Sequence, residues 1–185
     1  MRPLKAETLR GMVTSAAMAA LGILLPMAFH AVGLGAKFMP MVLVLLLSGF
    51  LCPLPWAVVT GAVVPIASGL MTGMPPLYPP YCAVMSVEMA VASGLAAILY
   101  RATNRRIWPA LLATIIFDRA ASIALTYALA GKFGLPPRVV SIASFVQGLP
   151  GIALQLTVIP LVVSTLARRR GMLFHHDHEP ETPVL

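Results

Sequence analysis

The chain has 185 residues, of which 59% are hydrophobic and 10% are charged, and its formal net charge is +7 at pH 7. A mean hydropathy of +0.90 lies outside the range of soluble domains and indicates an integral membrane protein. A transmembrane helix needs about 20 apolar residues, so the length allows about six spans and no second domain. The basic residues do not alternate with aromatic ones, so we expect no nucleic-acid partner.

Apolar runs separated by glycine, proline and charged residues predict an all-α membrane protein with six transmembrane helices. The expected ranges are 8–33, 38–52, 55–73, 83–102, 107–130 and 140–167. The first run is too long for a signal-peptide core and lacks a convincing A-x-A cleavage site before the next run, so we expect a retained helix. We expect one domain over residues 1–170 and a flexible cytoplasmic tail over 171–185, which is polar and contains prolines.

Lysine and arginine residues are distributed unequally between the two sets of helix ends. One set carries nine of them: Arg2, Lys5, Arg10, Arg101, Arg105, Arg106, Arg168, Arg169 and Arg170. The other set carries three: Lys37, Lys132 and Arg138. Positive charge is retained on the cytoplasmic side, so we expect both termini in the cytoplasm and residues 74–82 on the outer face. The charge also predicts attraction to anionic headgroups of the lipid bilayer.

A loop with the sequence TGMPPLYPPYC contains four prolines and ends in Cys82. The prolines fix the shape of the loop, and the start of the next helix favours a thiolate. Cys82 is therefore either a structural residue or a functional thiol. Cys52 is expected at the opposite membrane face, too far away for a disulfide, whose Cα separation is about 5.5 Å. We interpret Cys52 as a small buried hydrophobic residue.

Three ionisable residues lie deep within the predicted helices: Glu88, Asp118 and Arg119. Each costs about 2.5–3.5 kcal/mol on an insertion scale, so each needs a structural or functional reason. Counted from the helix ends, Glu88 and Arg119 lie at matched depths of roughly 18–20 Å. The favoured interpretation is a structural ion pair between these two residues. The alternative is a polar floor under an outward-opening ligand pocket, and Asp118 either shares Arg119 or faces that pocket.

The first predicted helix contains TSAAMAALG, in which Ala16 and Ala20 are four residues apart. Such a spacing of small residues lets another helix approach closely within lipid. The spacing alone favours packing inside the bundle, and the alternative is docking of a partner membrane protein.

Residues 15–101 resemble the S-component, the substrate-binding subunit of energy-coupling factor (ECF) vitamin transporters. The resemblance rests on the TGMPP turn after a G-x-V-x-P helix and on the glutamate that opens the E-x-A stretch of VEMAVASGLAAILYR. It implies a six-helix protein of the bacterial cytoplasmic membrane that binds a vitamin from outside and has no enzymatic domain. It also implies that Ala16 and Ala20 dock on the transmembrane coupling subunit of an ATPase-driven module.

Cys82 departs from the apolar continuation that is usual in that family, and here the chain resembles the BtuM-like, cobalamin-specific group. This resemblance implies uptake of cobalamin (vitamin B12), with the Cys82 thiolate as an axial ligand of cobalt and with removal of a cyanide ligand as an associated reaction. Cobalamin is then cargo, and no intrinsic cofactor is expected. The expected substrate contacts are His30, Met74, Pro75, Pro76, Leu77, Tyr78, Tyr81 and Cys82.

Other functions stay open at this point. The same scaffold serves many ligands, so another vitamin is the first alternative. The second alternative is a membrane enzyme with Cys82 as nucleophile and His30 as base, although the sequence offers no third group to orient that base. His30 itself is either a further cobalt donor or an interfacial histidine.

Overall fold

The computed structural model describes residues 6–77, 81–133 and 148–175, with side chains over 8–77, 82–125 and 148–168. This part of the chain is helical and contains no strand. The helices are α1 (Ala6–Ala31), α2 (Gly35–Phe38), α3 (Pro40–Leu51), α4 (Leu54–Thr72), α5 (Tyr81–Ala102), α6 (Ile107–Phe133) and α8 (Leu149–His175).

Five helices, α1, α4, α5, α6 and α8, are long and apolar enough to cross a membrane. The expectation of a multi-pass helical membrane protein is thereby confirmed. The predicted second span, 38–52, is different, because α3 has only 12 residues. At 1.5 Å per residue it is about 18 Å long, which is short of a hydrocarbon core of about 30 Å.

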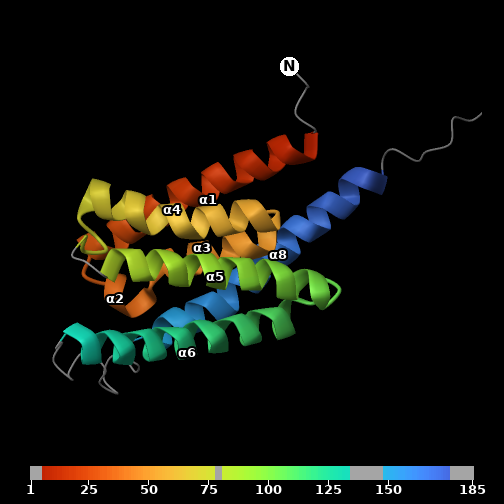
Figure 1. Cartoon of the computed structure of the whole chain (residues 1–185). Helices are drawn as coiled ribbons and strands as arrows, with labels where there is room; N and C mark the ends of the chain where they lie inside the picture. The colour runs from red at the N-terminus through yellow and green to blue at the C-terminus, as the bar shows by residue number, and fades with distance from the viewer. Residues whose placement is uncertain (1–5, 78–80, 134–147, 176–185) are drawn as a thin grey trace, which may run out of the picture.

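Helix α3 is the centre of the bundle. Every residue from 40 to 50 is buried, and the helix contacts α1, α4, α5 and α8. Its sequence, PMVLVLLLSGFL, is apolar on all sides, which is typical of a helix surrounded by other helices. Figure 1 shows α8 crossing the bundle behind α3 and α5.

Two glycines allow α5 to lie close to its neighbours. A Cβ atom at Gly49 of α3 would lie 2.5 Å from the Ser93 carbonyl oxygen, and a Cβ atom at Gly61 of α4 would lie 2.5 Å from the Met89 carbonyl oxygen. Backbones in contact replace the hydrophobic effect as the source of helix association in lipid. Close packing therefore fixes the position of α5, which carries both Glu88 and Cys82.

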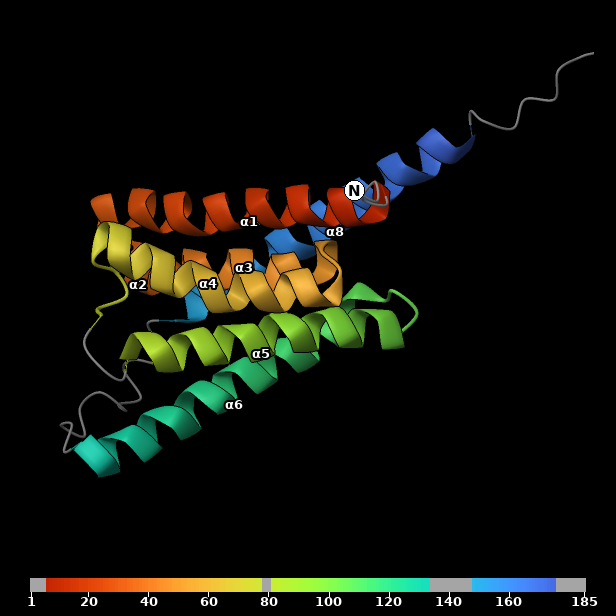
Figure 2. The ribbon, with the colours of Figure 1, turned by 45° about the horizontal axis from the view of Figure 1, so that its top comes forward.

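One end of the bundle contains the start of α1, the α3–α4 turn, the α5–α6 turn and the end of α8 (Figure 1). Arg10, Arg101, Arg105, Arg106 and Arg168 are exposed at this basic end. The opposite end contains the end of α1, α2, the end of α4 and the start of α5. Figure 2 shows that α5 and α6 diverge toward that opposite end.

Arg101 links the end of α5 to the α3–α4 turn at the basic end. Its Nη1 and Nη2 donate to the carbonyl oxygens of Ala97, at 2.7 Å, and Cys52, at 2.9 Å. Cys52 is only 1% exposed, and this burial raises the pKa of its thiol to about 11 although the charge of Arg101 lowers it. The interpretation of Cys52 as a buried hydrophobic residue is confirmed.

The last helix differs from its predicted range of 140–167. Residues 140–147 lie outside the described residues, and α8 begins at Leu149, with Pro150 at its second position. Proline is favoured in the first turn because it lacks the N–H that has no partner there. The helix continues to His175, five residues into the predicted tail, and residues 176–185 lie outside the described part.

Candidate functional site

A cavity of about 800 Å³ lies where α1 and α4 end and α5 begins. Pockets for small molecules typically measure about 300–1,000 Å³, so this one suits a large ligand. Its described walls come from α1, α2, the start of α3, the segment after α4, α5 and α6. Four predicted ligand contacts line it: His30, Met74, Pro75 and Pro76.

Methionine side chains form much of the cavity wall: Met27, Met39, Met41, Met74, Met85 and Met89. Flexible thioether side chains adapt to irregular apolar shapes, so the wall can follow the outline of a bulky ligand. Of these methionines, only Met74 was predicted from the sequence. The spacing of Met85, Glu88 and Met89, at i, i+3 and i+4, places them on one helical face and was the available signal.

The segment after α4 is held against the helix end. The Ser68 hydroxyl donates to the Met74 carbonyl at 2.7 Å, and the Met74 N–H donates to Thr72 Oγ1 at 3.2 Å. Gly73 ends α4 with φ of 73°, in the left-handed region that favours glycine. These contacts position Met74, Pro75 and Pro76 at the cavity.

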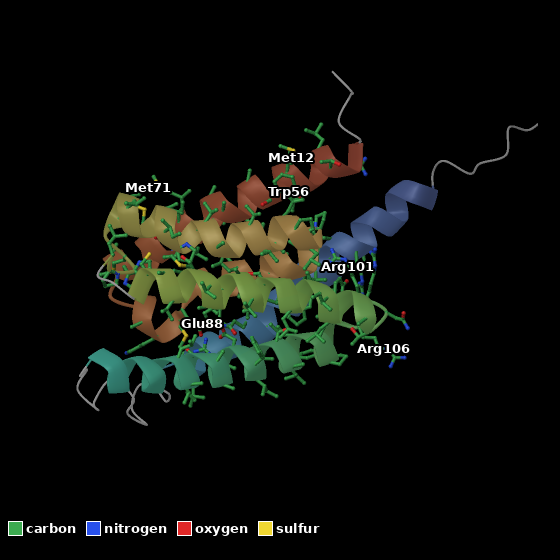
Figure 3. The ribbon with its side chains drawn as sticks, in the orientation of Figure 1. Met12, Trp56, Met71, Glu88, Arg101 and Arg106 are labelled. Atoms are coloured by element: carbon green, nitrogen blue, oxygen red, sulfur yellow. The ribbon has the colours of Figure 1, made fainter. Side chains whose placement is uncertain are left out.

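Glu88, Arg119 and Ser122 also line the cavity, and we call them the polar floor. Arg119 donates from Nε to Asp118 Oδ2 at 3.1 Å, and its Nη2 pairs with the same oxygen. Its Nη1 lies 3.2 Å from the Met39 sulfur. Asp118 is fully buried, whereas the Arg119 side chain is 19% exposed. In Figure 3, Glu88 lies between α5 and α6, far from Arg101 and Arg106.

These contacts contradict the predicted ion pair between Glu88 and Arg119. Among the described residues, Arg119 pairs with Asp118 and Glu88 forms no salt bridge. Glu88 interacts instead with the side chain of Ser122, and it feels the charge of Arg119 without pairing with it. The reason is that Asp118, fully buried and adjacent to Arg119, needs the nearest cation to offset its desolvation. Glu88 and Arg119 do meet at one cavity, as their depths predict.

Cys82 is buried, at 6% exposed, and is not part of the described cavity wall. Its thiol donates to the Pro65 carbonyl of α4, with the sulfur 3.7 Å from the oxygen. Cys82 precedes Met85 and Met89 by three and seven residues, so its Cα lies on the same side of α5. The side chain has to turn away from Pro65 for its sulfur to reach a ligand in the cavity.

Both cysteines are free. Cys82 lies near the start of α5, and Cys52 contacts Arg101 near the end of that helix. Residues 82 and 101 are about 28 Å apart at 1.5 Å per residue. This agrees with the expectation that no disulfide joins them.

The other residues that were predicted to contact the ligand do not all lie at the cavity. The ring of His30 occupies the space where a side chain at position 35 would lie, which explains Gly35 at that point. Leu77 is exposed and is not in the cavity wall. Tyr78 lies outside the described residues, and Tyr81 is the first residue of α5, with its side chain outside the described part.

Ala16 and Ala20 are exposed on the outer face of α1. The face that packs inside the bundle is an adjacent one: Ser15 is hydrogen-bonded to Thr60, and Gly22 lies against Val64. The expectation from spacing alone, packing inside the bundle, is therefore wrong for these two alanines. Their face is open to lipid or to another protein.

No family model, no curated protein and no solved structure matches the chain. Among the described residues, no group of three or more His, Cys, Asp or Glu side chains could hold a metal ion. The features of the chain that bear on function are the cavity, its polar floor and the sequence motifs around it.

Proposed function

We propose that this chain is the substrate-binding component of a vitamin uptake system in a bacterial cytoplasmic membrane, similar to ECF S-components, and that its cargo is cobalamin. The cavity of about 800 Å³ at the end of the bundle carries the proposal. The TGMPP segment, on which the resemblance rests, contributes Thr72, Met74, Pro75 and Pro76 to its wall. A rigid proline segment and adaptable methionines suit a large, mostly apolar macrocycle.

Cys82 supplies the upper axial ligand of cobalt in this proposal. Thiolate is a soft donor that suits such a metal. The cobalt arrives inside its corrin ring, so the protein needs only one donor of its own. When cobalamin binds, the Cys82 sulfur leaves its contact with the Pro65 carbonyl and coordinates cobalt instead.

Removal of cyanide then follows as a ligand exchange. The Cys82 thiol loses its proton and its sulfur donates an electron pair to form the cobalt–sulfur bond. Cyanide leaves with the electron pair of the broken cobalt–carbon bond and takes up a proton, so it departs as hydrogen cyanide. The cobalt keeps its oxidation state, so no reductant is required.

The outer face of α1 is the proposed docking surface for the coupling subunit and its ATPases. The exposure of Ala16 and Ala20 supports this role, because small residues let a partner helix approach closely. The basic end of the bundle faces the cytoplasm in this arrangement, and the cavity opens to the outside.

The thiol-enzyme alternative finds less support. A nucleophilic cysteine needs a base within hydrogen-bond reach, but the Cys82 thiol donates to a backbone carbonyl. His30 lies instead on the cavity wall, beside Gly35.

The deciding experiment is binding of cyanocobalamin to the purified, detergent-solubilised protein, with riboflavin, biotin and thiamin as comparisons. We expect a red complex with a visible spectrum shifted from that of free cyanocobalamin. Binding of another vitamin in its place would support the alternative cargo and contradict the corrinoid proposal.

A further inference from the structure

The polar floor contains one carboxylate that no described cation pairs. Arg119 is already engaged by Asp118, and the described partner of Glu88 is the side chain of Ser122. Glu88 is half-buried and lines the cavity between Met85 and Met89. A carboxylate accepts several hydrogen bonds, so Glu88 can take a further donor from a ligand.

Arg119 offers the complementary group. Two of its donors are used by Asp118 Oδ2, but Nη1 is directed to the sulfur of Met39 at 3.2 Å. A thioether is a weak acceptor. The flexible Met39 side chain can yield to a ligand oxygen, which would accept a stronger, charge-assisted hydrogen bond.

We propose that the polar floor binds a primary carboxamide of the ligand. The amide N–H donates to the carboxylate of Glu88, and the amide carbonyl accepts from Nη1 of Arg119. A ligand carboxylate would face Glu88 with like charge, and an ammonium would leave Nη1 without an acceptor. This inference rests on the proposed function, because the corrin ring of cobalamin carries carboxamide side chains around its edge.

The test compares cyanocobalamin with its monocarboxylic acid isomers, in each of which one peripheral carboxamide has become a carboxylate. Affinities are measured for the full-length wild type and for Glu88→Gln, which keeps the size of the side chain and its capacity to bond Ser122. The matched control is Ser93→Ala, on the same helix. Ser93 donates to the Leu45 carbonyl at 3.0 Å and lies outside the described cavity wall.

We expect the wild type to reject at least one acid isomer, with an affinity about tenfold or more below that for cyanocobalamin, because like charges in a buried contact repel strongly. Glu88→Gln should remove most of this preference, and Ser93→Ala should keep it. A preference that is unchanged in Glu88→Gln, or absent from the wild type, would overturn the carboxamide site while leaving cobalamin binding intact. Failure of the wild type to bind cyanocobalamin would overturn the proposed function and this inference together.

Discussion

Glu88 of α5 and Arg119 of α6 line the same cavity, yet the guanidinium of Arg119 pairs with Asp118 and leaves Glu88 to Ser122. The two carboxyl groups, of Asp118 and Glu88, therefore have different roles. The Asp118–Arg119 pair gives a fully buried carboxylate its counter-ion through Oδ2, whereas the carboxyl group of Glu88 lies on the cavity wall.

The first prediction concerns the stability of that ion pair. Asp118→Ala leaves Arg119 without its counter-ion, and Arg119→Ala leaves a fully buried carboxylate unpaired. Each change should lower the free energy of unfolding by about 3–5 kcal/mol. The double replacement should be less harmful than either single change. Thermal unfolding in detergent measures these differences.

Glu88→Gln is the matched control, because Glu88 forms no salt bridge among the described residues. It should change the unfolding temperature much less than Asp118→Ala. A loss of stability in Glu88→Gln equal to that in Asp118→Ala would instead favour a structural ion pair between Glu88 and Arg119.

At Glu88 and Arg119 the sequence predicts one aspect of the structure, the depth of each residue, but not which side chains touch. Counting residues along a helix gives depth, and depth correctly brings Glu88 and Arg119 to one cavity. The rotation of each helix decides which side chains touch, and tertiary packing sets that rotation. The same limit applies to Ala16 and Ala20, whose spacing identifies a small-residue face but not the direction in which it points.

Hydropathy likewise predicts some features of the fold and misses others. Long apolar runs predict α1, α4, α5 and α6 to within a few residues. The run containing α3 is equally apolar, and its range of 38–52 is also within a few residues of Pro40–Leu51. A helix enclosed by others need not match the bilayer thickness, so the expectation that failed is that this helix spans the membrane. The methionine wall was missed because it is assembled from several segments distant in sequence.

The second prediction concerns the cobalt ligand. Cys82→Ser removes the soft donor with little change in volume, so the visible spectrum of bound cyanocobalamin should lose its thiolate character and affinity should fall. Cys52→Ser is the control, since the Cys52 thiol is buried and the pKa of about 11 keeps it protonated at neutral pH. Identical spectra and affinities for wild type and Cys82→Ser would rule out coordination by this sulfur.

The third prediction concerns orientation in the membrane. Both native cysteines are buried, so they are replaced by alanine and single cysteines are introduced at the exposed positions Lys37 and Arg106. Lys37→Cys should react with an impermeant maleimide in intact cells, and Arg106→Cys only after lysis, because the proposed orientation places the basic end in the cytoplasm. The reverse labelling pattern would mean that the topology is inverted.

The fourth prediction concerns the outer face of α1. Ala16→Leu or Ala20→Leu should impair vitamin uptake by cells, because a larger side chain keeps a partner helix at a distance. Binding of ligand by the isolated protein should stay unchanged, since both positions are exposed. Ala113→Leu, at an exposed position of α6, is the control. Equal loss of uptake in all three variants would indicate a general membrane defect rather than a docking face.

The last prediction links helix packing to the cavity. A Cβ atom at Gly61 would lie 2.5 Å from the Met89 carbonyl oxygen and 2.8 Å from the Ala90 Cα. These backbone atoms yield only if α5 moves, so Gly61→Ala should destabilise the protein by about 1–3 kcal/mol. It should also weaken ligand binding, because Met89 lines the cavity.

Gly94→Ala on α5 is the matched comparison for Gly61→Ala. The nearest atom to a Cβ at Gly94 is Val58 Cγ2, at 2.9 Å. Val58 is an exposed side chain, and its methyl groups can shift without moving the backbone, so this variant should keep most of its stability and its ligand affinity. Thermal unfolding and cyanocobalamin titration of both variants measure the difference. Equal effects of the two substitutions would show that the spacing of α4 and α5 at Gly61 does not control the cavity.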